Sequence, residues 1–73
     1  MIKTPQLKPQ KVIKALERLG FKEVRQRGSH ARLIHPDGRK ITVAKHNRPI
    51  FVGTLHLILN QAKITLEILL ENL

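Results

Sequence analysis

The segment HARLIHPDGRKITVA, residues 30–44, decides the fold because a tight turn sits between two alternating apolar patterns. The Pro-Asp-Gly sequence at 36–38 is typical of a turn, since proline fixes its φ angle and glycine accepts a positive one. Residues 30–35 and 39–44 are therefore expected to form two strands that pair as an antiparallel hairpin.

The length of this turn fixes the register of the hairpin. A three-residue loop at 36–38 sets His35 opposite Arg39 and Leu33 opposite Ile41. Because side chains alternate along a strand, the core face carries Ala31, Leu33, Ile41 and Val43. The open face then carries His30, Arg32, Ile34, Lys40 and Thr42. A slip by one residue would bury two cations and an imidazole together, which their desolvation cost opposes.

The flanking segments read as helices and one further strand. Apolar residues recur at helical spacing after Pro9, and Gly20 suits the end of that helix. Residues 21–26 are expected to form the first strand, followed by a turn at 27–29. A second helix is expected from Thr54, as N-cap, to Ala62. A short third helix follows with Thr65 as its N-cap and with one face made of Leu66, Leu69, Leu70 and Leu73.

This order predicts an α+β fold, α-β-β-β-α(-α), with a three-stranded antiparallel sheet and helices on one face. At 73 residues the chain is expected to be one domain, 1–73, with a loose N-terminus at 1–8. A domain this small has no room for a deep substrate cavity or a large cofactor. No apolar run reaches transmembrane length and no signal peptide is apparent, so we expect a cytoplasmic protein with no membrane association.

The charge of the chain is strongly positive and unevenly distributed. Fourteen Lys and Arg face five acids, for a formal net charge of +9. Thirteen of the cations and three of the acids lie in residues 1–48, whereas residues 49–73 are nearly neutral and apolar. So high a charge on a small domain costs stability through self-repulsion, which favours a polyanionic partner over simple solvation. Nucleic acid is the first candidate.

The residue types exclude several kinds of site. There is no cysteine, and the spacing of the four histidines matches no compact metal motif, so neither a metal nor another cofactor is expected. Phe21 and Phe51 are the only aromatic residues besides histidine, which leaves little for base stacking. We therefore expect nucleic acid to be held mainly through its phosphates and its shape.

His30 is the candidate catalytic residue, because an exposed imidazole among cations can move a proton near neutral pH. It follows Gly28 and Ser29, a flexible turn that allows a phosphate to approach closely. The alternative is that His30 is an ordinary exposed strand residue. His35 is expected to be structural, at the start of its turn, and His56 to be merely solvated.

The chain also resembles a known family at several separated motifs. These are RQRGSH at 25–30, HPDGR at 35–39, TV at 42–43, His46, GTL at 53–55 and ILNQA at 58–62. Taken together they are similar to HicA, the YcfA-like toxins of HicA–HicB toxin–antitoxin systems. The family favours a glycine after the second helix, where this chain has Lys63.

The resemblance implies a double-stranded-RNA-binding-like fold and an mRNA interferase that cleaves RNA independently of the ribosome. It implies that the histidine of the Gly-Ser-His motif, here His30, is essential. It also implies a HicB antitoxin that covers the active site. The apolar residues Ile50, Phe51, Leu66, Ile68 and Leu73 either contact such a partner, contact a second copy, or complete the core.

The first hypothesis is therefore a metal-independent endoribonuclease with His30 as general base on a ribose 2′-hydroxyl. In this hypothesis Arg32 and Lys40 hold the scissile phosphate, while the flanking RNA backbone contacts Arg25, Arg27, Gly28, Ser29 and Lys45. The second hypothesis is a non-catalytic module that binds double-stranded RNA. A third is an interaction subunit whose basic sheet docks on an acidic protein.

Overall fold

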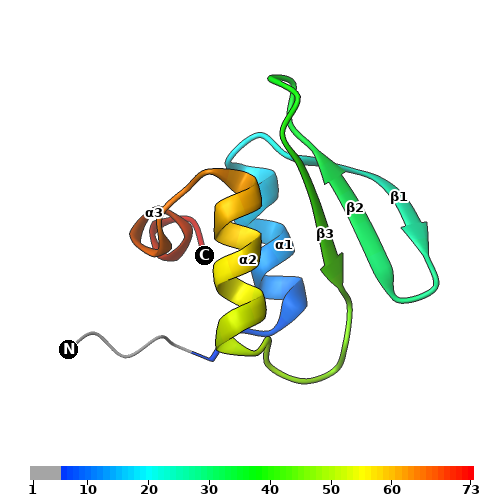
Figure 1. Ribbon diagram of the computed structural model, residues 1–73, viewed down its shortest axis with the longest axis vertical. Helices are drawn as coiled ribbons and strands as arrows, with labels where there is room; N and C mark the ends of the chain where they lie inside the picture. Colours follow the sequence, from blue (N-terminus) through cyan, green and yellow to red (C-terminus); the bar gives the residue numbers. More distant parts are fainter. Residues whose placement is uncertain (1–5) are drawn as a thin grey trace.

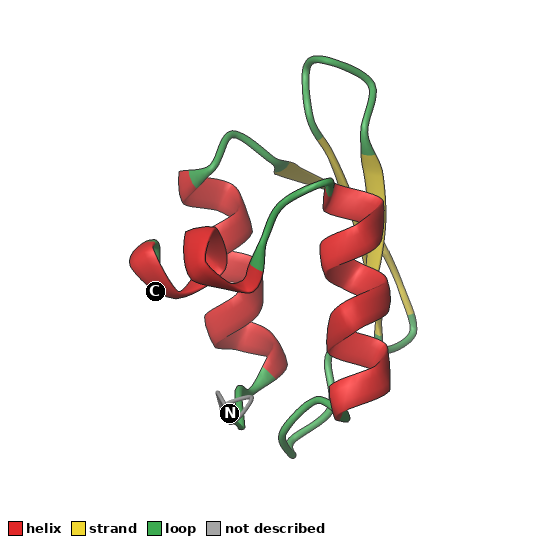
Figure 2. Ribbon diagram, turned by 60° about the vertical axis from the view of Figure 1, so that its left-hand side comes forward, coloured by secondary structure: helices red, strands yellow, loops and turns green. Residues whose placement is uncertain are grey.

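The structure is a computed structural model that describes residues 6–73 (Figure 1). It confirms the expected α+β arrangement, with a three-stranded antiparallel sheet of order β1-β2-β3. The helices gather on one side of this sheet, and the other side is left uncovered (Figure 2). The elements are α1 (Pro9–Arg18), β1 (Lys22–Arg27), β2 (His30–Ile34), β3 (Lys40–Ala44), α2 (Val52–Ala62) and α3 (Leu66–Glu71).

The β2–β3 hairpin has the register that the turn predicted. Leu33 pairs with Ile41, and the N–H of His35 donates to the carbonyl of Arg39 at 2.9 Å. The core-face side chains of both strands are at most 1% exposed, which confirms the predicted alternation: Ala31, Leu33, Ile41 and Val43. The opposite face is thereby directed away from the helices.

The core forms where the helices meet this face. Leu16 of α1, Leu55 of α2 and Leu69 of α3 are each at most 1% exposed. Burying one such side chain stabilises the fold by about 1.5–3 kcal/mol. α1 and α2 contact the sheet and α3 packs against α1, so the three helices share one core with the sheet, and no charged or polar side chain is buried within residues 6–73.

β1 pairs with β2 through one irregularity that the sequence did not reveal. Glu23 lies opposite Leu33 while Arg25 lies opposite Arg32, so Val24 is an extra residue, a β-bulge. The bulge moves the following residues by one step in the alternation. Arg25 therefore shares a face with Arg32, whereas Glu23 lies on the side of the helices.

The 35–39 turn folds back onto the helical layer through a compact cluster. His35 packs edge-on against Phe21, with ring centroids 5.1 Å apart, and the guanidinium of Arg39 lies 5.0 Å from the same ring. Arg39 also donates to the carboxylate of Asp37 at 2.8 Å and to the carbonyl of Ala62, at the end of α2. These contacts attach the hairpin to the helices and confirm that His35 is structural.

α2 begins at Val52, so the prediction of Thr54 as its N-cap is wrong. The carbonyl of Phe51 accepts the N–H of Leu55 at 2.8 Å, which makes Phe51 the N-cap although its side chain makes no capping hydrogen bond. The buried Leu55 fixes the first turn against the core. Packing therefore determines the start of this helix, and a capping side chain does not.

The end of α2 and the start of α3 depend on backbone geometry. Lys63 adopts the left-handed conformation, with φ 55° and ψ 43°, and the N–H of Ile64 donates to the carbonyl of Leu59 at 3.1 Å. This is a Schellman ending, at the position where the similar family favours glycine. Thr65 then caps α3 as predicted, because its Oγ1 accepts the N–H of Ile68 at 3.2 Å.

The N-terminal segment and the apolar C-terminal third are partly packed. Of the segment expected to be loose, residues 1–8, the structure describes 6–8, and there Leu7 is 9% exposed and its carbonyl accepts the N–H of Ile50 at 2.8 Å. Residues 1–5 lie outside the described residues. Of the apolar residues considered for a partner, Ile50 and Leu66 pack against the core, while the exposed ones are Phe51, Ile68 and Leu73. Within residues 6–73 no helix combines the length and apolarity needed to cross a bilayer.

Lys63→Gly is expected to stabilise the protein. A left-handed backbone costs a non-glycine residue about 1–2 kcal/mol, and the exposed Lys63 side chain has no hydrogen bond to lose. We expect the free energy of unfolding to rise by about 1 kcal/mol, measured by urea denaturation followed by circular dichroism. Lys14→Gly, in the middle of α1, is the control and should lower it by about 1 kcal/mol. An equal fall in the free energy of unfolding for both variants would contradict the left-handed conformation of Lys63.

Asp37→Asn is expected to remove an acid-dependent part of the stability. The hydrogen bond from Arg39 holds the pKa of the Asp37 carboxyl below its ordinary value of 3.8. A lowered folded pKa adds stability that is fully present above 3.8 and is lost as the pH falls through the folded value. The stability difference between parent and variant should therefore shrink in acid. The same comparison in an Arg39→Gln background should show a smaller pH dependence, because the guanidinium makes the largest contribution to the lowered pKa.

Candidate functional site

The uncovered face of the sheet is a continuous cationic surface. The strand register sets Lys22 opposite Ile34, Arg25 opposite Arg32, and Arg27 opposite His30. On the third strand Lys40 and Thr42 share this face. No Asp or Glu belongs to this face in the three strands. We call it the cationic face and define it by Lys22, Arg25, Arg27, His30, Arg32, Lys40 and Thr42.

A shallow pocket of about 140 Å³ lies within the cationic face. Its lining is one imidazole, three guanidinium groups and one hydroxyl, from Arg25, Arg27, His30, Arg32 and Thr42. His30 is exposed, as predicted. The pocket can therefore receive an anionic group that touches the imidazole and several cations at once.

Two local features of the chain bring these side chains together. The first is the two-residue turn at Gly28 and Ser29, which sets Arg27 directly opposite His30. Gly28 has φ +59°, the positive value that such tight hairpin turns require at their first central residue. A Cβ at Gly28 would meet nothing within 4 Å, so the turn leaves open space beside the imidazole. The second feature is the bulge at Val24, which sets Lys22, on the other side of the bulge, on the same face as Arg25 and Arg27.

The structure does not bring Lys40 into the pocket. Lys40 lies opposite Ile34, four residues along β2 from His30, which is roughly 13 Å at the usual rise of a strand. It belongs to the same face at the far end of the sheet. An anionic group bound next to His30 is close to Arg32. Lys40 can contact only a more distant part of a long anionic ligand.

Lys45 does not share a face with His30. Its ammonium forms an ion pair with Glu23 at 3.0 Å and donates to the side-chain oxygen of Gln26 at 3.0 Å. Glu23 and Gln26 are paired with core-face residues of β2, so this cluster lies on the helical side of the sheet. The prediction that Lys45 contacts RNA remains untested, and its position gives it no support.

Sequence reasoning missed two members of the cationic face. Thr42 was assigned to the open face but not to the site, although it lines the pocket with Arg32, its partner across the strands. Lys22 was not considered, because its face depends on the bulge at Val24. The sequence did contain a signal for Thr42, because the predicted hairpin register already paired it with Arg32 on the open face.

The remaining histidines and acids do not add to this site. His46 lines a separate cavity near the start of α2, and His56 is exposed on that helix. Among residues 6–73 no group of three or more His, Asp or Glu side chains is arranged to hold a metal ion. The chemistry of the pocket is therefore that of an imidazole, guanidinium groups and a hydroxyl.

The sequence comparisons agree with this arrangement. The model of a protein family described as the HicA toxin of bacterial toxin–antitoxin systems matches residues 9–64, from the start of α1 to just beyond the end of α2. No curated protein sequence matches the chain. The family match spans the whole cationic face and more than half of the chain, so the protein belongs to the HicA toxin family, whose members are the toxins of toxin–antitoxin pairs.

Proposed function

We propose that this toxin is a metal-independent, ribosome-independent endoribonuclease that cleaves mRNA with His30 as its general base. The observation that carries the proposal is the exposed imidazole of His30 in a pocket lined by three arginines. HicA toxins in general cleave RNA, so the family supports the same activity.

The reaction follows from the groups that line the pocket. His30 takes the proton of a ribose 2′-hydroxyl, and the resulting oxygen attacks the adjacent phosphorus. The bond from phosphorus to the 5′ oxygen breaks, which leaves a 2′,3′-cyclic phosphate and a 5′-hydroxyl. The departing 5′ oxygen takes up a proton from solvent or from the imidazolium of His30, and His30 returns to its neutral form in either case.

The cations of the pocket have separate tasks in this proposal. Arg32 contacts the scissile phosphate and stabilises the charge that develops on it. Arg25 and Arg27, both on β1, bind the phosphates that flank the scissile one. The turn at Gly28 and Ser29 lets the RNA backbone approach closely. Lys40 and Lys22 extend the contact along the sheet. A single base without a paired acid makes a slow nuclease.

The antitoxin partner is proposed to cover the same surface. Within residues 6–73, no residue of the cationic face forms an ion pair with an acidic side chain of the chain itself. An acidic HicB-like antitoxin would pair with these cations and exclude RNA from His30.

His30→Ala is expected to lower RNA cleavage by about 10²–10⁴-fold, the usual contribution of a general base. The measurement is the rate at which a labelled single-stranded RNA is shortened in EDTA, with folding checked by circular dichroism. His56→Ala, another exposed histidine, is the matched control and should cleave at the parental rate. If His30→Ala cuts as fast as the parent, the general-base assignment is wrong. If the parent binds RNA without cutting it, the protein is a binding module.

Arg27→Gln is expected to weaken the salt dependence of RNA binding. Each phosphate contact to single-stranded RNA contributes about 0.7 to the slope of log K against log salt. In a His30→Ala background, Arg27→Gln should reduce that slope by about this amount. Lys45→Gln, whose ammonium is paired with Glu23 on the opposite face, should leave the slope unchanged. An equal reduction for Lys45→Gln would restore Lys45 to the RNA-binding surface.

A further inference from the structure

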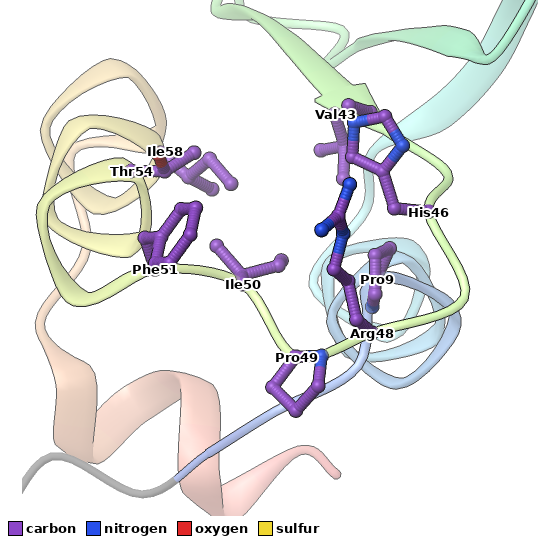
Figure 3. A pocket seen from close by; sticks show the side chains of 10 residues that line it. Pro9, Val43, His46, Arg48, Pro49, Ile50, Phe51, Thr54 and Ile58 are labelled. Carbon is purple, nitrogen blue, oxygen red and sulfur yellow. The ribbon is translucent and has the colours of Figure 1, made fainter.

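A second, larger cavity of about 250 Å³ lies where the β3–α2 connector passes the starts of α1 and α2. Figure 3 shows its two sides, with Phe51, Thr54 and Ile58 on the side of α2 and with His46 and Arg48 facing them. Apolar side chains form most of its lining. The remaining lining residues are Pro9, Val43, Ala44, Pro49 and Ile50.

This cavity lies beside the candidate catalytic site, although no residue lines both. Ala44 lines the cavity, and Ala44 is also the residue that pairs with His30 across the β2–β3 ladder. Directly paired residues of an antiparallel sheet have Cα atoms about 4.5–5.5 Å apart. The cavity therefore begins within about one nucleotide of the imidazole, around the end of β3.

The lining chemistry of the cavity suits a flat, acceptor-rich ring. Phe51 is 77% exposed, whereas Phe21 is 3% exposed, so Phe51 is the one aromatic ring of residues 6–73, other than histidine, that is free to stack. Arg48 presents a planar guanidinium on the opposite side, and arginine planes also stack on bases. Arg48 and His46 also carry nitrogen donors that can bind the acceptor atoms of a base, and none of the lining residues is acidic.

We propose that this cavity is a subsite for one unstacked nucleobase of the RNA strand whose scissile phosphate lies at His30. The proposal rests on the proposed nuclease function and adds to it the position at which the enzyme contacts a base. Its volume lies below the roughly 300–1,000 Å³ of clefts that enclose drug-sized ligands, which fits one ring system. The guanidinium of Arg48, the lack of an acid in the lining and the closeness of Ala44 to His30 favour RNA over a second, equally basic copy of this chain.

The subsite gives the base a positioning role. A base held between Phe51 and Arg48 fixes how far the strand advances across the cationic face, and so which phosphate reaches His30. The sheet has no Phe, Tyr or Trp on its open face, so in this proposal it contacts mainly the RNA backbone. Discrimination between RNA sequences would thus arise at the end of β3, outside the catalytic pocket.

Phe51→Ala is the test of this subsite, with Leu57→Ala as the matched control. Leu57 is 56% exposed on the same helix but does not line the cavity. The probe is a labelled single-stranded RNA of eight nucleotides, compared with a set of the same RNA in which one nucleotide at a time lacks its base. Binding is measured in a His30→Ala background, so that the result does not depend on cleavage.

We expect Phe51→Ala to weaken binding of the intact RNA roughly 5- to 100-fold, as loss of one stacked base does, and Leu57→Ala to have no effect. One abasic RNA should bind the Phe51-containing protein as weakly as the intact RNA binds Phe51→Ala, and Phe51→Trp should restore affinity. Equal affinities of all variants overturn the subsite. The subsite is also overturned if Phe51→Ala changes only the sedimentation coefficient of the protein without RNA, because that result identifies a contact between copies of the chain.

The outcomes separate this inference from the proposed function. Cleavage that depends on His30 together with no effect of Phe51→Ala retains the nuclease and removes the subsite. Conversely, a stacking effect at Phe51 in a protein that does not cut RNA retains the base site and removes the catalytic proposal. In the cutting enzyme, Phe51→Ala should raise KM for the intact RNA and leave kcat for the abasic RNA unchanged.

Discussion

The register of the β2–β3 hairpin is the constraint on which the rest of the molecule depends. The helices cover one face of the sheet. The position of a strand residue in the alternation therefore decides whether its side chain lies in the core or in solvent. The cluster of His35, Asp37 and Arg39 fixes that place, because it closes the turn and attaches it to Phe21 and to the end of α2. One anchored turn therefore buries Leu33 and exposes His30 together.

The hairpin and its faces were predictable from the sequence because turn chemistry and alternation are local properties of the chain. The position of His30 and Arg32 followed directly from them, as did the structural role of His35. The bulge at Val24 was not predictable, because it depends on how β1 meets β2 after both have formed. The start of α2 was missed for a similar reason, since the burial of Leu55 determines it and no capping residue signals it.

The charges of the chain are divided between structural and functional use. Two of its five acids, Glu23 and Asp37, form ion pairs with Lys45 and Arg39, both away from the cationic face. The cations of the open face are left without acidic neighbours from the described chain, and their mutual repulsion costs stability. A bound polyanion would relieve that repulsion, so the proposed affinity for RNA and the cost in stability have the same cause.

The same division bears on how a toxin of this family is controlled. In the proposed mechanism, an antitoxin that covers the cationic face competes with RNA for the same cations, so toxicity and its neutralisation depend on a single surface. The cavity beside Phe51 lies around the end of β3, outside that surface. A partner that masks only the cations blocks the catalytic pocket and leaves the proposed base subsite open. If both proposed sites hold RNA, a partner that excludes it fully has to reach past Ala44, which pairs with His30 and lines the cavity.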